Sequence, residues 1–169
     1  MQGGIVLKKQ SNLSRLLSYA GRYRNFTYAS WILSAVSALI ALVPFWYIWK
    51  IINEVLEVSP NFGSAANLTH YGIMAMTYAI ISYLIYIGAL LCSHLAAFRI
   101  AANMRIDITE HISKLPIGFA DSFGSGKLRK IINDSTAATE TYLAHQLPDK
   151  YAAMATPVGL LALLLVFDW

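Results

Sequence analysis

Three stretches of the chain are apolar for long enough to cross a lipid bilayer. They cover residues 26–49, 71–98 and 151–167, and none of them contains Asp, Glu, Lys or Arg. A helix needs about 20 predominantly apolar residues to span the hydrocarbon core. We therefore predict three membrane-spanning helices, of which the second is long enough to be tilted or to protrude from the membrane.

A polar passage over residues 99–150 separates the second apolar stretch from the third. Its first part continues the helical pattern to about Lys114, since no helix breaker precedes Pro116. A second charged helix, over residues 127–147, then leads back to the membrane. We predict a helical hairpin whose two arms extend several turns beyond the bilayer.

The tip of this hairpin carries the local signals of a short transverse helix. Pro116 fits the first turn of a helix, where its missing N–H would be unpaired anyway. Gly124 fits the residue just past a helix end, where positive φ is favoured, and Ser125 fits the N-cap of the returning arm. Phe119 and Phe123 are four residues apart and therefore share one face. The pattern predicts a tip that presses two aromatic side chains against another surface.

The first 25 residues combine a basic lead with an amphipathic helix. No signal-peptide cleavage pattern occurs in the lead. Arg15 and Arg22 lie opposite an apolar face that is formed by Leu13, Leu16, Leu17 and Ala20. We interpret this segment as an interfacial "elbow" helix in the headgroup layer. The alternative is the first helix of a soluble bundle.

Small residues recur at every fourth position in the first two apolar stretches. The two stripes are Ser30, Ser34 and Ala38, and Ala89, Ser93 and Ala97. Such stripes allow helices to approach closely in a membrane. We expect another helix to be able to pack closely along such a stripe.

Pro44 and a group of aromatic residues mark the far end of the first span. We expect Pro44 to bend the helix without ending it, because neighbouring groups can satisfy the carbonyl that it frees. Trp46, Tyr47 and Trp49 are typical of a membrane interface, where Lys50 can reach water. A loop over residues 51–69 is predicted to follow.

Composition and charge agree with an integral membrane protein. The chain is 57% hydrophobic and 13% charged, whereas soluble domains carry about 25% charged residues. Lys and Arg gather in the lead and in residues 99–150, and the 51–69 loop has none. By the positive-inside rule, the N-terminus and residues 99–150 are cytoplasmic. The net charge is +4, but it is the arrangement of the Lys and Arg residues that predicts topology, and we expect no nucleic-acid partner.

Candidate chemistry is sparse. Gly124 to Leu128 is not a phosphate-binding loop, because Asp121 stands where that pattern needs Gly and Leu128 where it needs Ser or Thr. The four histidines lack metal-ligand spacing, and no catalytic grouping can be assembled. His94 lies inside a span, where an ionisable residue either lines a pathway or hydrogen-bonds to a neighbouring helix. We predict no catalytic residue and no metal site in this chain.

The order of these parts resembles the N-terminal half of the transmembrane domain of ATP-binding cassette (ABC) transporters with the exporter, or type IV, fold. The resemblance covers the chain from about Leu13 onward. It rests on Leu115-Pro116 through Phe119, Asp121, Gly126, Leu128, Asn133-Asp134, Leu147-Pro148-Asp149 and Asp168-Trp169. Ala120 departs from the pattern, since a second aromatic residue is usual there.

The resemblance implies an all-α membrane protein with an elbow helix (residues 1–25) and part of a transmembrane domain (residues 26–169). The first coupling helix would comprise Pro116, Ile117, Gly118, Phe119, Ala120, Asp121, Ser122 and Phe123, with Gly124 and Gly126 as hinges. Its expected partners are the lipid bilayer, a nucleotide-binding domain that holds ATP and Mg²⁺, and a second transporter half. We expect it in a bacterial plasma membrane, with His94 as a candidate for the substrate path.

Two other interpretations stay open. Residues 141–149 are similar to a subgroup of the same fold that includes siderophore-uptake members. A complete three-span scaffold or partner-binding subunit would also account for the lack of catalytic groups. A fragment of a secondary transporter would be expected to show broken helices and charged residues near the bilayer midplane, and neither is clear here.

Overall fold

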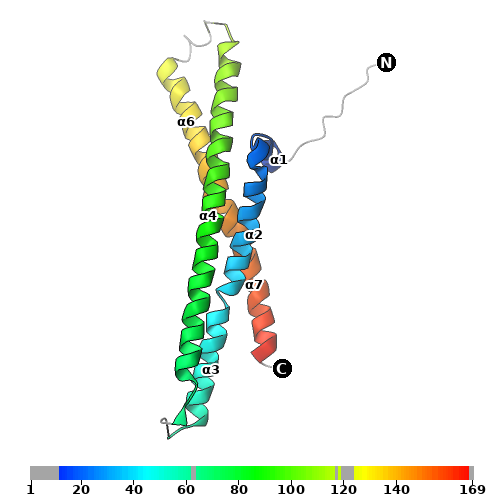
Figure 1. Cartoon of the computed structure of the whole chain (residues 1–169). Helices are drawn as coiled ribbons and strands as arrows, with labels where there is room; N and C mark the ends of the chain where they lie inside the picture. Colours follow the sequence, from blue (N-terminus) through cyan, green and yellow to red (C-terminus); the bar gives the residue numbers. More distant parts are fainter. Residues whose placement is uncertain (1–11, 62–63, 117, 119–123, 168–169) are drawn as a thin grey trace, which may run out of the picture.

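The computed structural model describes residues 12–61, 64–116, 118 and 124–167, and these residues form helices and their connections (Figure 1). Three helical stretches are long and apolar enough to cross a membrane: Gly21–Glu57, Leu68–Ser113 and Ser125–Val166. The predicted all-α class with three candidate spans is confirmed. The limits of the spans within the bilayer stay a prediction.

Helix α4 (Leu68–Ser113) runs the length of the molecule, and the other helices are arranged along it (Figure 1). Its 46 residues correspond to about 69 Å at about 1.5 Å per residue, more than twice the roughly 30 Å of a hydrocarbon core. The chain leaves the helix at its C-cap, Lys114, two residues before Pro116. The prediction that this helix continues without a break to about Lys114 is therefore confirmed.

The first span is interrupted near its middle. Two residues separate helix α2 (Arg24–Ile40) from α3 (Val43–Glu57), in which Pro44 occupies the first turn. Proline has no N–H to donate to the carbonyl four residues earlier, which here belongs to Ile40. Ala41 and Leu42 keep right-handed helical dihedral angles, so the path continues across the interruption. The proline thus ends the regular hydrogen bonding of α2, which is more than the predicted bend.

The connection between α3 and α4 is shorter than predicted. Helix α3 continues to Glu57, so the loop does not begin at residue 51. Glu54 accepts a hydrogen bond from the backbone N–H of Asn67 at 2.9 Å, which joins the two helices at this end. Lys50 Nζ lies 5.5 Å from the ring centroid of Trp46 and 5.5 Å from that of Tyr71. The aromatic surroundings predicted for Lys50 are confirmed.

The return path consists of α6 (Ser125–Thr141), a π-helical turn named η3 (Tyr142–Gln146) and α7 (Leu147–Phe167). Gly124 precedes α6 with φ of 74°, the positive value expected for it. Ser125 is the first residue of α6 and Gly124 is its N-cap, so the prediction that Ser125 caps this helix is wrong. A glycine suits this position because no Cβ opposes its conformation.

Both small-residue stripes are largely buried in the middle of the molecule, so the prediction that another helix packs along such a stripe is confirmed. Ser30 and Ser34 of α2 are at most 1% exposed, and so are Ala89, Ser93 and Ala97 of α4. Ala38 is only half-buried, and Ser37 instead donates a hydrogen bond to the carbonyl of Ser82 at 3.0 Å. We call the region around these buried residues of α2 and α4, together with the adjoining η3, the middle of the molecule.

The elbow helix α1 (Asn12–Ser18) and the short helix η1 (Gly21–Tyr23) rest on α4 beyond its apolar part. Asn103 donates a hydrogen bond to the carbonyl of Tyr19 at 2.8 Å, and the Tyr19 hydroxyl donates to Asp107 at 2.9 Å. The hydrogen bond to Asp107, together with burial, raises the pKa of Tyr19 above its ordinary value. Arg99 lies 5.1 Å from the ring centroid of Tyr23. The elbow is thus fixed to the polar C-terminal part of α4.

Candidate functional site

The predicted coupling helix lies largely outside the described residues. The structure does not describe six of its residues, and their roles stay predictions: Ile117, Phe119, Ala120, Asp121, Ser122 and Phe123. Of the other candidates at the tip, Pro116, Gly118, Gly124 and Gly126 are all exposed. What the structure establishes is the pair of arms that carries this tip.

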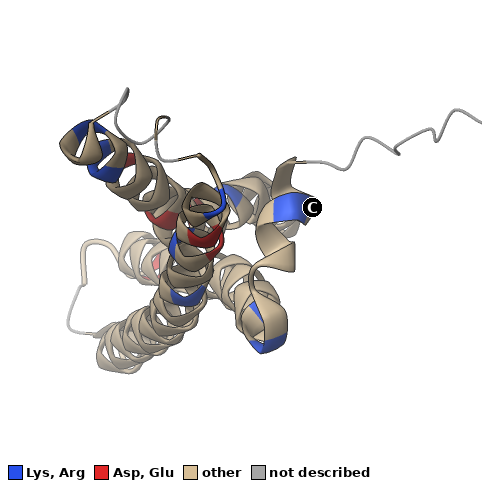
Figure 2. Ribbon diagram, turned by 90° about the horizontal axis from the view of Figure 1, so that it is seen from above, with Lys and Arg blue, Asp and Glu red and all other residues tan. Residues whose placement is uncertain are grey.

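The two arms are α6 and residues 99–113 of α4, and charged side chains are spread along both (Figure 2). The extension of α4 beyond Arg99 amounts to roughly 22 Å of helix at about 1.5 Å per residue. Thr136 is the buried residue of α6, at 0% exposure. The arms therefore touch through very little buried surface.

One polar contact joins the arms halfway along. Arg105 Nε of α4 donates a hydrogen bond to Thr136 Oγ1 at 2.9 Å, and its guanidinium lies 3.9 Å from the carboxylate of Glu140. Thr136 in turn donates to the backbone of its own helix, at the carbonyls of Ile132 and Asn133. A partly exposed ion pair at this distance contributes little stability, so the hydrogen bond is the stronger link.

The space between the arms toward the tip is a groove of about 340 Å³. Ile112 of α4 lies on one side and Leu128 and Ile132 of α6 lie on the other, with Arg105 and Arg129 at the edges. The arms are thus separated by an apolar groove between Thr136 and the tip. This geometry lets the tip be displaced with little loss of packing.

The returning helix crosses α4 at an irregular joint that the sequence only partly predicts. Pro148 has no N–H for the carbonyl four residues earlier, which belongs to Ala144. Ser93 of α4 donates a hydrogen bond to that carbonyl at 2.8 Å. The local winding is π-helical, and the N–H of Leu147 bonds to the carbonyl of Tyr142. A side chain on one helix therefore satisfies the backbone group that a proline frees on another.

His94 lies beside this joint and faces a second histidine. Its ring centroid is 4.8 Å from that of His145 in η3, in an edge-on arrangement, and 5.6 Å from that of Phe98. His94 is half-buried and His145 is exposed. The structure records no hydrogen bond from His94 to a neighbouring helix within its described residues. In the same part of the chain, no group of three metal-ligating side chains is found.

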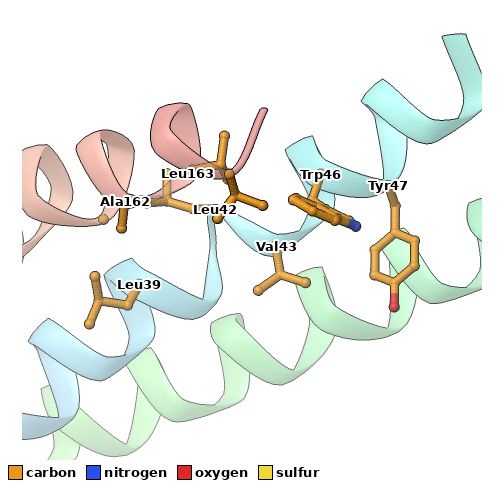
Figure 3. A pocket seen from close by; sticks show the side chains of 9 residues that line it. Leu39, Leu42, Val43, Trp46, Tyr47, Ala162 and Leu163 are labelled. Carbon is orange, nitrogen blue, oxygen red and sulfur yellow. The ribbon is translucent and has the colours of Figure 1, made fainter. Parts of the chain in front are cut away.

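A second groove, of about 420 Å³, lies where α2 gives way to α3 (Figure 3). Leu42, Val43 and Trp46 line it from the first span, and Ala162 and Leu163 line it from α7. Gly159 of α7 allows this close approach, because a Cβ there would lie 2.5 Å from Leu42 Cδ1 and 2.7 Å from Leu39 Cδ2. The groove is apolar and offers no reactive group.

The contact between His94 and His145 was missed by sequence reasoning, which treated the histidines as scattered. The signal that could have found it is Pro148, since a proline in a membrane helix requires a donor for a freed carbonyl. Ser93 was predicted as a packing residue, and it is also that donor. Placing Ser93 against Ala144 puts the next residue of each helix, His94 and His145, side by side.

The chain is similar both to a known protein family and to individual curated proteins. Residues 27–169 match the family model described as the ABC transporter transmembrane region. Similar curated proteins include the mycobactin import ATP-binding/permease protein IrtA of Mycobacterium tuberculosis, which is 31% identical over 140 residues. The proteins of the same name from Mycolicibacterium smegmatis and Mycolicibacterium thermoresistibile are 28% and 30% identical over 140 and 146 residues.

The match covers 83% of this chain in each case but only a small part of each relative. The matched region is 16% of the length of the first two relatives and 15% of the third. Those proteins therefore contain much that has no counterpart in the present chain.

Proposed function

The chain belongs to the family of ABC transporter transmembrane regions, and on that premise we propose that it forms part of the substrate path of an ATP-driven transporter. It would contribute no catalytic group of its own. Its mechanical part would be the hairpin, with residues 116–123 as the first coupling helix. The observation that carries this proposal is the single unbroken helix α4, which extends about 22 Å past the apolar stretch as a rigid arm.

The contacts of the arms support a role in transmitting motion. Because α4 is continuous from Leu68 to Ser113, a push at the tip reaches the membrane without an intervening joint. On the return path the π-helical turn of η3 lies where α6 meets α7, and such turns occur frequently at functional sites. In this proposal the arm of α4 would act as a lever, and the return path would bend at η3.

The partners of this lever are proposed from the family and from the names of the relatives. A nucleotide-binding domain would dock on residues 116–123 and would itself hold ATP and Mg²⁺. The relatives are called ATP-binding/permease proteins, which fits a domain carried on the same polypeptide. A second transporter half would complete the path. In this arrangement the N-terminus and residues 99–150 face the cytoplasm.

For the substrate, we propose a siderophore taken up by the cell. The supporting observation is that the three relatives are all named for mycobactin import. His94 and His145 would present polar groups to the path at the level of the joint. The substrate could be tested by uptake of radiolabelled iron as different siderophore complexes into cells that carry or lack the gene.

The coupling role can be tested by replacing the two aromatic residues of the tip. In the reconstituted transporter that contains this chain, Phe119→Ala and Phe123→Ala should each reduce substrate transport by roughly tenfold or more, as expected when a buried aromatic anchor worth about 2 kcal/mol is lost. Nucleotide binding should not change, because the site for ATP is elsewhere. Transport and ATP hydrolysis are measured in the same vesicles, so that uncoupling shows as hydrolysis without transport.

Ile131→Ala provides the control, since this residue is an exposed apolar residue of α6 away from the tip. Its transport rate should equal that of the parent. If both tip variants transport at the parent rate, the coupling role is wrong. If the chain proves to be a complete protein that neither transports nor assembles with a nucleotide-binding domain, the scaffold interpretation replaces it.

A further inference from the structure

We propose that the groove between the elbow helix and the first span binds an anionic phospholipid. The groove has a volume of about 420 Å³, within the range of about 300–1,000 Å³ that is common for small-molecule sites. Leu13 and Leu17 of α1 form one wall, and Tyr28 and Trp31 of α2 form the other. This proposal rests on the membrane location of the chain and does not depend on its transport role.

Charge at the mouth of the groove favours an anion. Arg24 lines it, and of the described residues that do so none is acidic. Arg24 Nε donates a hydrogen bond to the Tyr28 hydroxyl at 2.9 Å, and the guanidinium lies 5.4 Å from the centroid of that ring. The guanidinium is thereby held in place, while the described part of the chain offers it no carboxylate. A phosphate group can accept two parallel N–H bonds from such a fork.

The walls combine polar and apolar groups, which suits a lipid headgroup together with the start of its acyl chain. The side chains of Ser14 and Ser18 lie along the same groove as the two leucines. Ser18 already donates to the carbonyl of Arg15 at 2.6 Å, whereas Ser14 is exposed. Phosphate and ester oxygens could therefore meet hydroxyl groups and Arg24, and the start of an acyl chain could lie against the leucines. A free phosphate would leave that apolar wall uncovered.

Trp31 gives an independent reason to expect a bound acceptor. The side chain is 8% exposed and packs between Tyr28 and Tyr151, with ring centroids 5.2 and 4.8 Å away. Its buried indole N–H has no hydrogen-bond partner in the part of the chain that the structure describes. Buried donors without acceptors are rare in folded proteins. An oxygen of a lipid headgroup seated in this groove would be a suitable acceptor.

The position of the groove relative to the membrane agrees with this ligand. Arg24 is the first residue of α2, and the apolar stretch begins two residues later at Phe26. The groove therefore lies where the chain passes from water into hydrocarbon, which is the level of the phosphate groups. Arg15 and Arg22 are exposed nearby in the sequence and add positive charge, which attracts anionic lipids to this surface.

The test uses the protein in nanodiscs that contain phosphatidylcholine with a small fraction of phosphatidylglycerol, and counts bound lipids by native mass spectrometry. We expect phosphatidylglycerol to be retained by the parent, and Arg24→Gln to reduce its retention by roughly tenfold, as is typical for loss of a charge-assisted hydrogen bond. Trp31→Phe keeps an aromatic ring, although a smaller one, and removes the indole N–H, and it should reduce retention by roughly fivefold.

Arg22→Gln is the matched control, because Arg22 carries the same charge two residues earlier but does not line the groove. It should lose much less phosphatidylglycerol than Arg24→Gln does, because its charge attracts anionic lipids without lining the groove. An equal loss in Arg22→Gln and Arg24→Gln would overturn the proposal, because it would indicate general attraction of charge. Unchanged retention in Arg24→Gln would overturn it as well. Displacement of the lipid by inorganic phosphate at millimolar concentration would show a phosphate site in place of a lipid site.

Discussion

The middle of the molecule and the two arms are held together in opposite ways. In the middle, small side chains bring helices close, and Ser30, Ala89 and Ala97 are fully buried. In the arms, α6 buries only Thr136 among its described residues. The middle is therefore stabilised by many close contacts, whereas α6 is held to α4 by few buried contacts and by the link from Arg105 to Thr136.

This difference separates the parts that must hold their shape from those that can move. Close-packed regions transmit strain and tolerate little change in volume. A segment with few buried contacts opens locally at low free-energy cost. We infer that a displacement of the tip would be absorbed in α6 and at the η3 joint, whereas α2 and α4 would stay together. Substitutions in the middle should thus destabilise the whole protein, whereas substitutions in α6 should affect α6 alone.

The largest effect is expected from adding volume to the middle. Ala97 is completely buried in the cluster that joins α4 to the elbow and to η3. Ala97→Leu should lower the free energy of unfolding by about 1–3 kcal/mol, because inserted methylene groups force neighbours apart. The loss can be measured by denaturant unfolding of the protein in detergent micelles.

The matched variant in the arm is Ala137→Leu. Ala137 is exposed on α6, and both alanine and leucine favour helix. Its free energy of unfolding should stay within about 0.5 kcal/mol of the parent value. Equal losses from the two substitutions would contradict the contrast between middle and arms.

A smaller effect is expected at the joint. Ser93→Ala removes the donor to the carbonyl of Ala144, which Pro148 cannot satisfy. The expected loss is about 1 kcal/mol, since the carbonyl is left unpaired but neighbouring backbone can partly adjust. The measurement is again the free energy of unfolding in detergent micelles.

The physical cause can be isolated with Pro148→Ala as a second change. An alanine at position 148 provides an N–H that can bond to Ala144 once the π-helical turn becomes α-helical. Ser93→Ala should therefore cost about 0.5 kcal/mol less in that background, which is a coupling that a double-mutant cycle can detect. Strict additivity would show that Ser93 serves only as a small packing residue.

The sequence predicted the long helices well because their signals are local and repeated. The apolar stretches, the lack of a breaker before Pro116 and the stripe at Ala89, Ser93 and Ala97 were sufficient for α4 and its packing. It predicted the interruption near Pro44 less well. Whether a proline bends a helix or ends its hydrogen bonding depends on the packing around it. Here Leu42 lies against Gly159 of α7. A local sequence pattern does not contain such a contact between distant segments.

The site was harder to predict, for the same reason. The pairing of His94 with His145 depends on the crossing of two helices that are separated by about 50 residues of chain. The tip residues Phe119 and Phe123 rest on resemblance alone, because they lie outside the described residues.

The smallest effect, and the most informative for the arms, is expected at the link that Arg105 makes between them. Thr136→Val keeps the shape of the side chain but removes the acceptor for Arg105 Nε. Arg105 is part-exposed and can turn to water, so the loss should be only about 0.5 kcal/mol. Hydrogen exchange should rise in α6 and stay unchanged in α2 and α7, because the opening is local. Thr139→Val is the control, since the Thr139 hydroxyl donates only to Ser135 in its own helix. Faster exchange throughout the molecule after Thr136→Val would mean that the arms and the middle unfold as one unit.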